Sequence, residues 1–329
     1  MSGHGGDESG WPPLSYPDWA ETCMALHLWT QIVGKYRLAH TPWVNHSWHA
    51  TLYVTSRGLT TGPVPDGDRA ITLTFDLREH VLLAESLDSR ERFPIEAMSV
   101  ADFLEQTTAL VQRLGGRMRI HGVPNEIPDA KPFAEDKAPR PYDREAVQRF
   151  HRVLVDVERV FQRFRTGFLG KVSPVHLFWG SFDLAVTRFS GRKAPPHPGG
   201  VPGLPDEVTR EAYSHEVSSA GFWPGGNGID FPAFYSYVYP KPEGFADERP
   251  SPEAAYFDEK MGEFLLPYDA VRRSSDPEAA LMAFLESTYR AAADLGGWKR
   301  VALECPAGIP RQPRVVCASA AAPAGGQAC

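Results

Sequence analysis

The chain has 329 residues, of which 42% are hydrophobic and 23% charged, so it is long enough for about two domains with a sizeable core. A formal net charge of −7 argues against a primary role on nucleic acid, which requires a basic surface. No stretch approaches the roughly 20 apolar residues of a membrane span, and the first residues lack the pattern of a secretory leader, so we expect a cytoplasmic protein.

Both ends of the chain differ in composition from its middle. Residues 1–10 are rich in glycine and polar residues, and residues 305–329 contain mainly proline, alanine, glycine and arginine without apolar periodicity. Such segments bury little apolar surface, so the sequence predicts disorder in both. The four cysteines form neither a CxxC pair nor a disulfide pattern, which predicts free thiols.

Residues 11–121 are predicted to form a first α+β unit. Apolar residues at helical spacing predict a helix that is capped by Asp18 and runs to about residue 38. The alternation over residues 46–55 then predicts a strand. His46 and His49 would fall on opposite faces of this strand, which favours structural roles, although His46 is placed to reach a cleft shared with a second unit.

The remainder of the first unit is predicted from turns and caps. Ser99 and Asp102 have the spacing of a capping box, which predicts a helix that ends at Gly115. The strands expected around this helix cover residues 71–76, 81–86 and 117–121.

A proline-rich connector, residues 122–142, precedes a second, expanded α+β unit over residues 143–304. Asp143 is expected to cap a strongly amphipathic helix. A long strand is predicted over residues 175–189. The unit closes with a further helix and a strand over residues 298–303.

Two pairs of segments indicate an internal duplication. Residues 103–116 and 284–297 share the pattern Phe-Leu-Glu, Thr, Leu-Gly-Gly with identical spacing, and residues 41–55 echo residues 173–187. The predicted fold is therefore α+β, with two units that each consist of an antiparallel sheet covered by helices. The second unit is longer in its middle, where we expect added chemistry.

Acid-base residues gather in this second unit. His215 is the candidate acid or base, and Glu216 or Asp183 would orient its ring. Arg188 or Lys171 would anchor an anionic substrate. The leading hypothesis is accordingly an enzyme that acts on a small organic molecule, with the site between the two units or within the second.

A divalent metal is a second interpretation of the same region. His176, His215 and Glu216 would supply two imidazoles and a carboxylate, a set that suits zinc or iron. The chain lacks HxxxH, HxH and HExxH spacing, and a histidine isolated on an apolar face is more often a buried structural residue.

The second unit is also rich in aromatic residues that suit a binding pocket. The candidates for substrate contacts are Trp179, Trp223, Tyr213 and Tyr235. The same rings could instead pack the core. Without turnover, such a pocket would make the protein a small-molecule-binding protein, and a purely structural or partner-binding role is a third interpretation. Glycine clusters match neither a phosphate loop nor a dinucleotide fingerprint, so no nucleotide cofactor is predicted.

Several sequence blocks carry a resemblance to a known family. These blocks are TPWVNH at 41–46, SPVHLFWGSFDLAVTRFSGR at 173–192, YSHE at 213–216 and GFWPG at 221–225. With them the chain resembles a bacterial family known only as a domain of unknown function, over about residues 11–304. The resemblance implies no activity, cofactor or catalytic residue.

Overall fold

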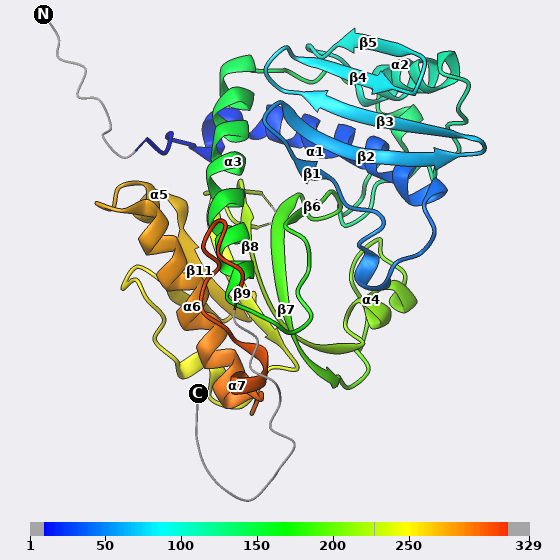
Figure 1. The fold of residues 1–329 in the computed structure, drawn as a ribbon. Helices are drawn as coiled ribbons and strands as arrows, with labels where there is room; N and C mark the ends of the chain where they lie inside the picture. Colours follow the sequence, from blue (N-terminus) through cyan, green and yellow to red (C-terminus); the bar gives the residue numbers. More distant parts are fainter. Residues whose placement is uncertain (1–9, 227, 315–329) are drawn as a thin grey trace, which may run out of the picture.

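The computed structural model describes residues 10–226 and 228–314, and they form two antiparallel sheets with helices packed against them (Figure 1). The first sheet is a meander whose strands follow the chain: β1 (Tyr53–Val54), β2 (Gly58–Asp66), β3 (Arg69–Asp76), β4 (Val81–Glu85) and β5 (Arg90–Pro94). The second sheet has the order β10-β11-β9-β8-β7-β6. Its strands are β6 (His176–Phe178), β7 (Asp183–Lys193), β8 (His215–Trp223), β9 (Ala233–Tyr239), β10 (Tyr256–Asp258) and β11 (Glu263–Pro267). The fold class is therefore α+β, as predicted.

Four long helices make most of the core with these sheets. They are α1 (Tyr16–His40), α2 (Val100–Arg113), α3 (Arg144–Thr166) and α6 (Pro277–Leu295). Helices α1 and α2 pack on the first sheet, whereas α3 and α6 pack on one face of the second sheet. Shorter helices are α4 (Asp206–Ala212), α5 (Tyr268–Arg272) and α7 (Arg300–Leu303), with 3₁₀ turns η1 (Asn45–Ser47), η2 (Phe133–Glu135) and η3 (Phe245–Asp247). Within the described ranges, no helix has the length and apolar character that crossing a membrane requires.

The two predicted caps explain where the central helices begin. The Ser99 hydroxyl accepts a hydrogen bond from the Asp102 amide at 3.0 Å, which completes the capping box of α2. The Asp143 carboxylate accepts from the first amides of α3 at 2.9 and 3.0 Å. Helix α1 begins earlier than predicted, with Ser15 at its cap and Asp18 in its first turn. There the negative charge of Asp18 interacts favourably with the helix dipole.

The halves of the chain share one continuous core. Leu52 and Leu177 exchange backbone hydrogen bonds of 2.9 and 2.8 Å, so the ends of the two sheets meet at a single bridge. Helix α3 packs against β7 of the second sheet, β1 of the first, and α1. Both halves have the order helix, antiparallel strands, helix. Their common origin by duplication stays a prediction.

The strand predicted over residues 46–55 is wrong for most of its length. The chain forms η1 and a turn there, and only Tyr53 and Val54 pair with β2. His46 and Ser47 have φ angles of 59° and 58°, in the left-handed region. A strand requires extended backbone, so two left-handed residues interrupt the alternation that suggested one.

Three further boundaries differ from the prediction. The strand predicted over residues 175–189 is two strands, because a turn with Phe182 at a φ of 57° separates β6 from β7. Residues 117–121 form no strand, since the Arg117 amide donates to the Asp66 carboxylate at 2.6 Å instead of to a neighbouring strand. Residues 300–303 are the short helix α7, which an Arg300–Glu304 ion pair at 2.6 Å supports.

Disorder was predicted at both ends of the chain. Most of these two segments lies outside the described residues, namely residues 1–9 and 315–329. The described residues 305–314 lie against the end of α3. There the Cys305 amide donates to the Gly167 carbonyl at 3.1 Å, and the Gly308 amide donates to the Thr166 hydroxyl at 2.9 Å. Cys23 and Cys305, the two cysteines in the described ranges, are free thiols.

Candidate functional site

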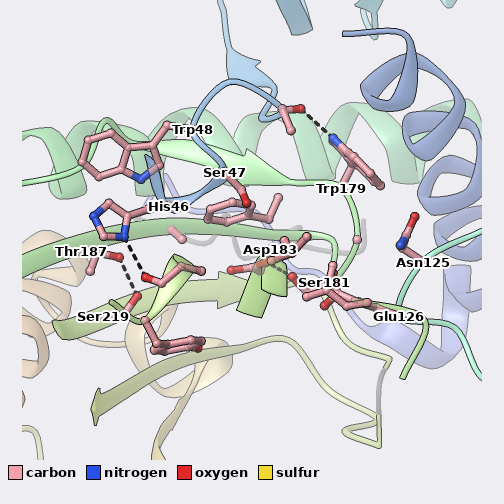
Figure 2. A pocket seen from close by; sticks show the side chains of 18 of the residues that line it. His46, Ser47, Trp48, Asn125, Glu126, Trp179, Ser181, Asp183, Thr187 and Ser219 are labelled. Atoms are coloured by element: carbon pink, nitrogen blue, oxygen red, sulfur yellow. Dashed lines mark hydrogen bonds between the residues drawn. The ribbon is translucent and has the colours of Figure 1, made fainter. Parts of the chain in front are cut away.

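A cavity of about 600 Å³ lies on the face of the second sheet that α3 and α6 leave uncovered. Strands β6 to β9 form its floor. Its other walls are the end of α1, the η1 turn, residues 121–126 of the connector, and the segment 203–213 that includes α4. Both halves of the chain therefore enclose it. In Figure 2, His46 and Trp48 lie at one end of the cavity, Asn125 and Glu126 lie at the other, and Asp183 lies between them.

The alternation of side chains along β7 determines which of its residues form the floor of the cavity. Asp183, Ala185, Thr187 and Phe189 of β7 all face it, while the residues between them face the helices. Neighbouring strands contribute in register, because Ala185 pairs with Gly221 and Gly221 pairs with Tyr235. Polar groups follow along the floor: the Thr187 and Ser219 hydroxyls are hydrogen-bonded at 2.8 Å, and those of Tyr213 and Tyr237 at 2.9 Å.

Asp183 is a buried carboxyl on this floor. Its side chain accepts hydrogen bonds from the hydroxyls of Tyr235 and Ser181, and the residue is 4% exposed. Burial raises the pKa of Asp183, against the two hydrogen bonds, which lower it. Tyr235 crosses Gly221 so closely that a Cβ there would lie 2.3 Å from the phenol ring. A glycine at this point of β8 is what allows Tyr235 to reach the carboxylate.

Glu126 is a second carboxyl in the cavity and comes from the connector. Its backbone has a φ of 58°, which is uncommon for a residue other than glycine and directs the side chain toward the β6–β7 turn. A Cβ at Gly180 of that turn would lie 2.0 Å from Glu126 Oε1, so the glycine makes room for the carboxylate. Burial and the neighbouring charge of Asp183 raise the pKa of Glu126 to about 7.

A third acidic residue lies on β11, the strand beside β9, and outside the lining of the cavity. Glu263 of β11 is 6% exposed, and burial together with the charges of Asp183 and Asp258 raises its pKa to about 8. Its charge also acts on Tyr235 and Tyr237, whose pKa values are raised mainly by burial. The charge of Asp183 therefore raises the pKa of both Glu126 and Glu263.

The opposite end of the cavity is basic. His46 Nδ1 lies 2.7 Å from the Ala212 carbonyl, which makes Nδ1 the donor and leaves Nε2 to accept a hydrogen bond from Lys171. The Lys171 ammonium also lies over the rings of Trp48 and Phe189, at 5.3 and 4.8 Å from their centroids. Burial lowers the pKa of both His46 and Lys171.

The structure brings together most of the residues predicted to contact a substrate. Trp179, Trp223, Tyr213 and Tyr235 all line the cavity, and so does Asp183, which was predicted to orient His215. Lys171 is outside the lining and reaches it through His46.

The other predicted catalytic residues are dispersed. His215 lies near His46, with ring centroids 6.1 Å apart, but Glu216 follows it in β8 and points to the other face, where it binds Arg192 at 2.7 Å. Arg188 also lies on that other face, where its guanidinium packs 3.4 Å from the Phe164 ring centroid and donates to the Phe164 carbonyl at 2.6 Å. Neither Glu216 nor Arg188 lines the cavity.

The predicted metal ligands are likewise not assembled. Among the described residues, no group of three or more His, Cys, Asp or Glu side chains is arranged to hold a metal ion. His176 is fully buried, and neither ring nitrogen has a hydrogen-bond partner in the described part of the chain. Burial lowers its pKa to about 3, so the ring is a neutral core residue.

The cavity residues that sequence reasoning missed include Lys35, Asn125 and Glu126. Lys35 had a usable signal, because it is a lysine on a turn of α1 that is otherwise apolar; in the fold it is 3% exposed and donates to Asn125 Oδ1. Asn125 and Glu126 lie in a connector without hydrophobic periodicity, so no sequence pattern marks them as functional.

The fold and the cavity define an α+β protein with two antiparallel sheets and an aromatic-lined pocket between its halves. Residues 11–305 match the model of DUF5996, a family of unknown function, and the chain belongs to that family. No curated protein and no solved structure matches the chain.

Proposed function

We propose that the protein is an enzyme that performs acid-base chemistry on a small organic molecule held in this cavity. The observation that carries the proposal is the carboxyl pair of Asp183 and Glu126, which lies in an aromatic pocket where burial raises both pKa values. Catalytic acids and bases require such tuned pKa values, and a volume of about 600 Å³ suits a small-molecule ligand.

The two carboxyls have different environments and would have different roles. Glu126, with a pKa near 7, exchanges a proton with the substrate, because both of its forms are populated at neutral pH. Asp183 is fixed by Tyr235 and Ser181 and therefore serves to position the substrate and to maintain the raised pKa of Glu126. In this proposal Glu126 replaces His215 as the acid or base, while Asp183 keeps the supporting role that the sequence analysis gave to Glu216 or Asp183.

Non-catalytic binding is a second candidate function. The rings of Trp179, Trp223 and Tyr235 on the cavity wall favour it, since they offer apolar contact without taking part in proton transfer. A binding protein would retain its ligand stoichiometrically and unchanged. For either function we also propose a cytoplasmic location, which the free thiols of Cys23 and Cys305 support.

The test begins with ligands that raise the melting temperature of the full chain, followed by mass spectrometry of each after incubation. An enzyme converts at least one ligand, and Glu126→Gln lowers kcat about 100-fold or more while ligand binding persists. Glu259→Gln is the matched control, because Glu259 is exposed between β10 and β11. Conversion at the wild-type rate by Glu126→Gln would refute the acid-base role, and bound ligands that all remain unchanged would favour the binding protein.

A further inference from the structure

The carboxyls of the cavity have no cationic partner in the described part of the chain. The neighbouring charges that act on Glu126 and Glu263 are those of other carboxyls, and Asp183 is bonded only to hydroxyls and backbone. Burying negative charge in this way is costly unless a positive charge compensates for it. Without a lysine or arginine beside them, Glu126 and Glu263 lower this cost by taking up protons more readily, and a bound cation would lower it further.

The cationic side chains of the cavity wall and of the second sheet are engaged elsewhere. Lys35, the lysine in the cavity wall, donates to Asn125 Oδ1 and lies 5.4 Å from the Trp179 ring centroid. Lys171 is bonded to His46 at the opposite end of the cavity. Arg188 lies on the other face of the second sheet, against Phe164. None forms an ion pair with Asp183 or Glu126.

Aromatic rings surround the same acidic end. Trp223 and Tyr235 have ring centroids 4.4 Å apart, and Tyr235 stacks on Tyr237 at 6.0 Å. The Trp223 Nε1 atom is buried without a hydrogen-bond partner in the described residues. Aromatic faces beside carboxylates are the features with which proteins recognise organic ammonium groups.

We propose that the ligand of this cavity is an organic cation, with an ammonium or amidinium nitrogen between Asp183 and Glu126 and an apolar body attached to it. This inference rests on the proposed function for its choice of cavity, but it requires only binding. The orientation follows from the two ends: the cation lies at the acidic end, and the body extends toward Trp48 and Phe189. His46 and Lys171 oppose a second cation at that far end.

Calorimetric titration of the wild-type full chain at pH 7.5 tests the charge preference with three probes that share an indole body. Tryptamine is the cation, tryptophol is neutral, and indole-3-propionate is the anion. We expect tryptamine to bind about tenfold more tightly than tryptophol, and indole-3-propionate to bind more weakly still. Equal or tighter binding of either analogue, or no binding of tryptamine at millimolar concentration, would overturn the inference.

Variants assign the preference to residues. Glu126→Gln and Asp183→Asn should each reduce tryptamine affinity about tenfold with little effect on tryptophol, and Glu259→Gln should change neither. A preference for tryptamine that persists in both carboxyl variants would overturn the assignment. The two proposals can fail separately. Binding of tryptamine without turnover of any substrate would refute only the proposed catalysis. Turnover of neutral molecules without a preference for ammonium compounds would refute only the proposed cationic ligand.

Discussion

At the scale of single residues, His176 is a titratable group that the fold buries without a hydrogen-bond partner in the described part of the chain. The sequence suggested a metal ligand, yet the ring is enclosed by Trp48 and Phe178 and neither nitrogen has a partner in the described residues. A neutral imidazole in such surroundings loses its hydrogen bonds to water without replacement, which costs about 1–3 kcal/mol per unsatisfied group. We therefore expect the imidazole of His176 to lower the stability of the fold.

His176→Leu should stabilise the protein, because it replaces unpartnered polar atoms with apolar ones. We expect the free energy of unfolding to rise by about 1 kcal/mol at pH 7.5. The folded pKa of about 3 lies below the unfolded value of 6.5, so the unfolded chain binds the proton more readily and wild-type stability is lost as the pH falls below 6.5. The gain should consequently be about 2 kcal/mol larger at pH 5 than at pH 7.5.

Urea unfolding of both proteins at the two pH values measures this gain. The other buried histidines, such as His27 with a pKa of about 4, are present in both proteins and cancel in the difference. A variant less stable than the wild type, or one that loses a stoichiometric metal, would show that the imidazole has a partner after all.

At the scale of elements, regular patterns were predictable and left-handed turns were not. The capping box of α2, the cap of α3, and strands β3 and β4 were found from spacing, because side chains near in sequence determine them. The turns at His46 and Phe182 depend on contacts with distant residues: the His46 amide donates to the Glu211 carboxylate at 2.9 Å, 165 positions away. No local pattern records such a contact.

Gly221→Ala tests whether β8 positions the floor of the cavity. The added methyl group would lie 2.3 Å from the Tyr235 ring, so Tyr235 must move and lose its hydrogen bond to Asp183. We expect a loss of about 1–3 kcal/mol in unfolding free energy, as for other overpacked sites, and about tenfold weaker tryptamine binding.

Gly122→Ala is the control for this change, since a Cβ there would meet nothing within 4 Å. It should leave both quantities within about 0.5 kcal/mol of the wild type. Unchanged tryptamine affinity in Gly221→Ala would mean that the contact between Tyr235 and Asp183 does not matter for binding.

At the scale of the whole molecule, the cavity belongs to neither half alone. The sequence located its floor, because Trp179, Asp183 and the tyrosines lie in the aromatic, expanded second half. It could not locate the facing wall. The η1 turn and Glu126 reach the cavity only because the bridge between Leu52 and Leu177 joins the sheets and the connector folds back onto the β6–β7 turn. Non-local assembly of this kind has no signature in periodicity or spacing.

Trp179 joins the two halves at the cavity wall, and its loss should therefore weaken both. Its indole Nε1 donates to the Ala50 carbonyl at 2.6 Å, and its ring lies against α1 so closely that a Cβ at Gly34 would meet it at 2.1 Å. Trp179→Phe removes the donor and leaves the buried carbonyl unpaired, which should cost about 1–3 kcal/mol. Trp43→Phe, at a ring that is 53% exposed, should cost less than about 0.5 kcal/mol.

Hydrogen exchange shows which elements lose stability in Trp179→Phe. If the halves unfold as one cooperative unit, amides of α1 and of β7 lose protection by the same free energy in Trp179→Phe, because opening either element requires opening both. Loss of protection confined to β7 would mean that the second half opens alone, and that the cavity is a contact between two independently stable units.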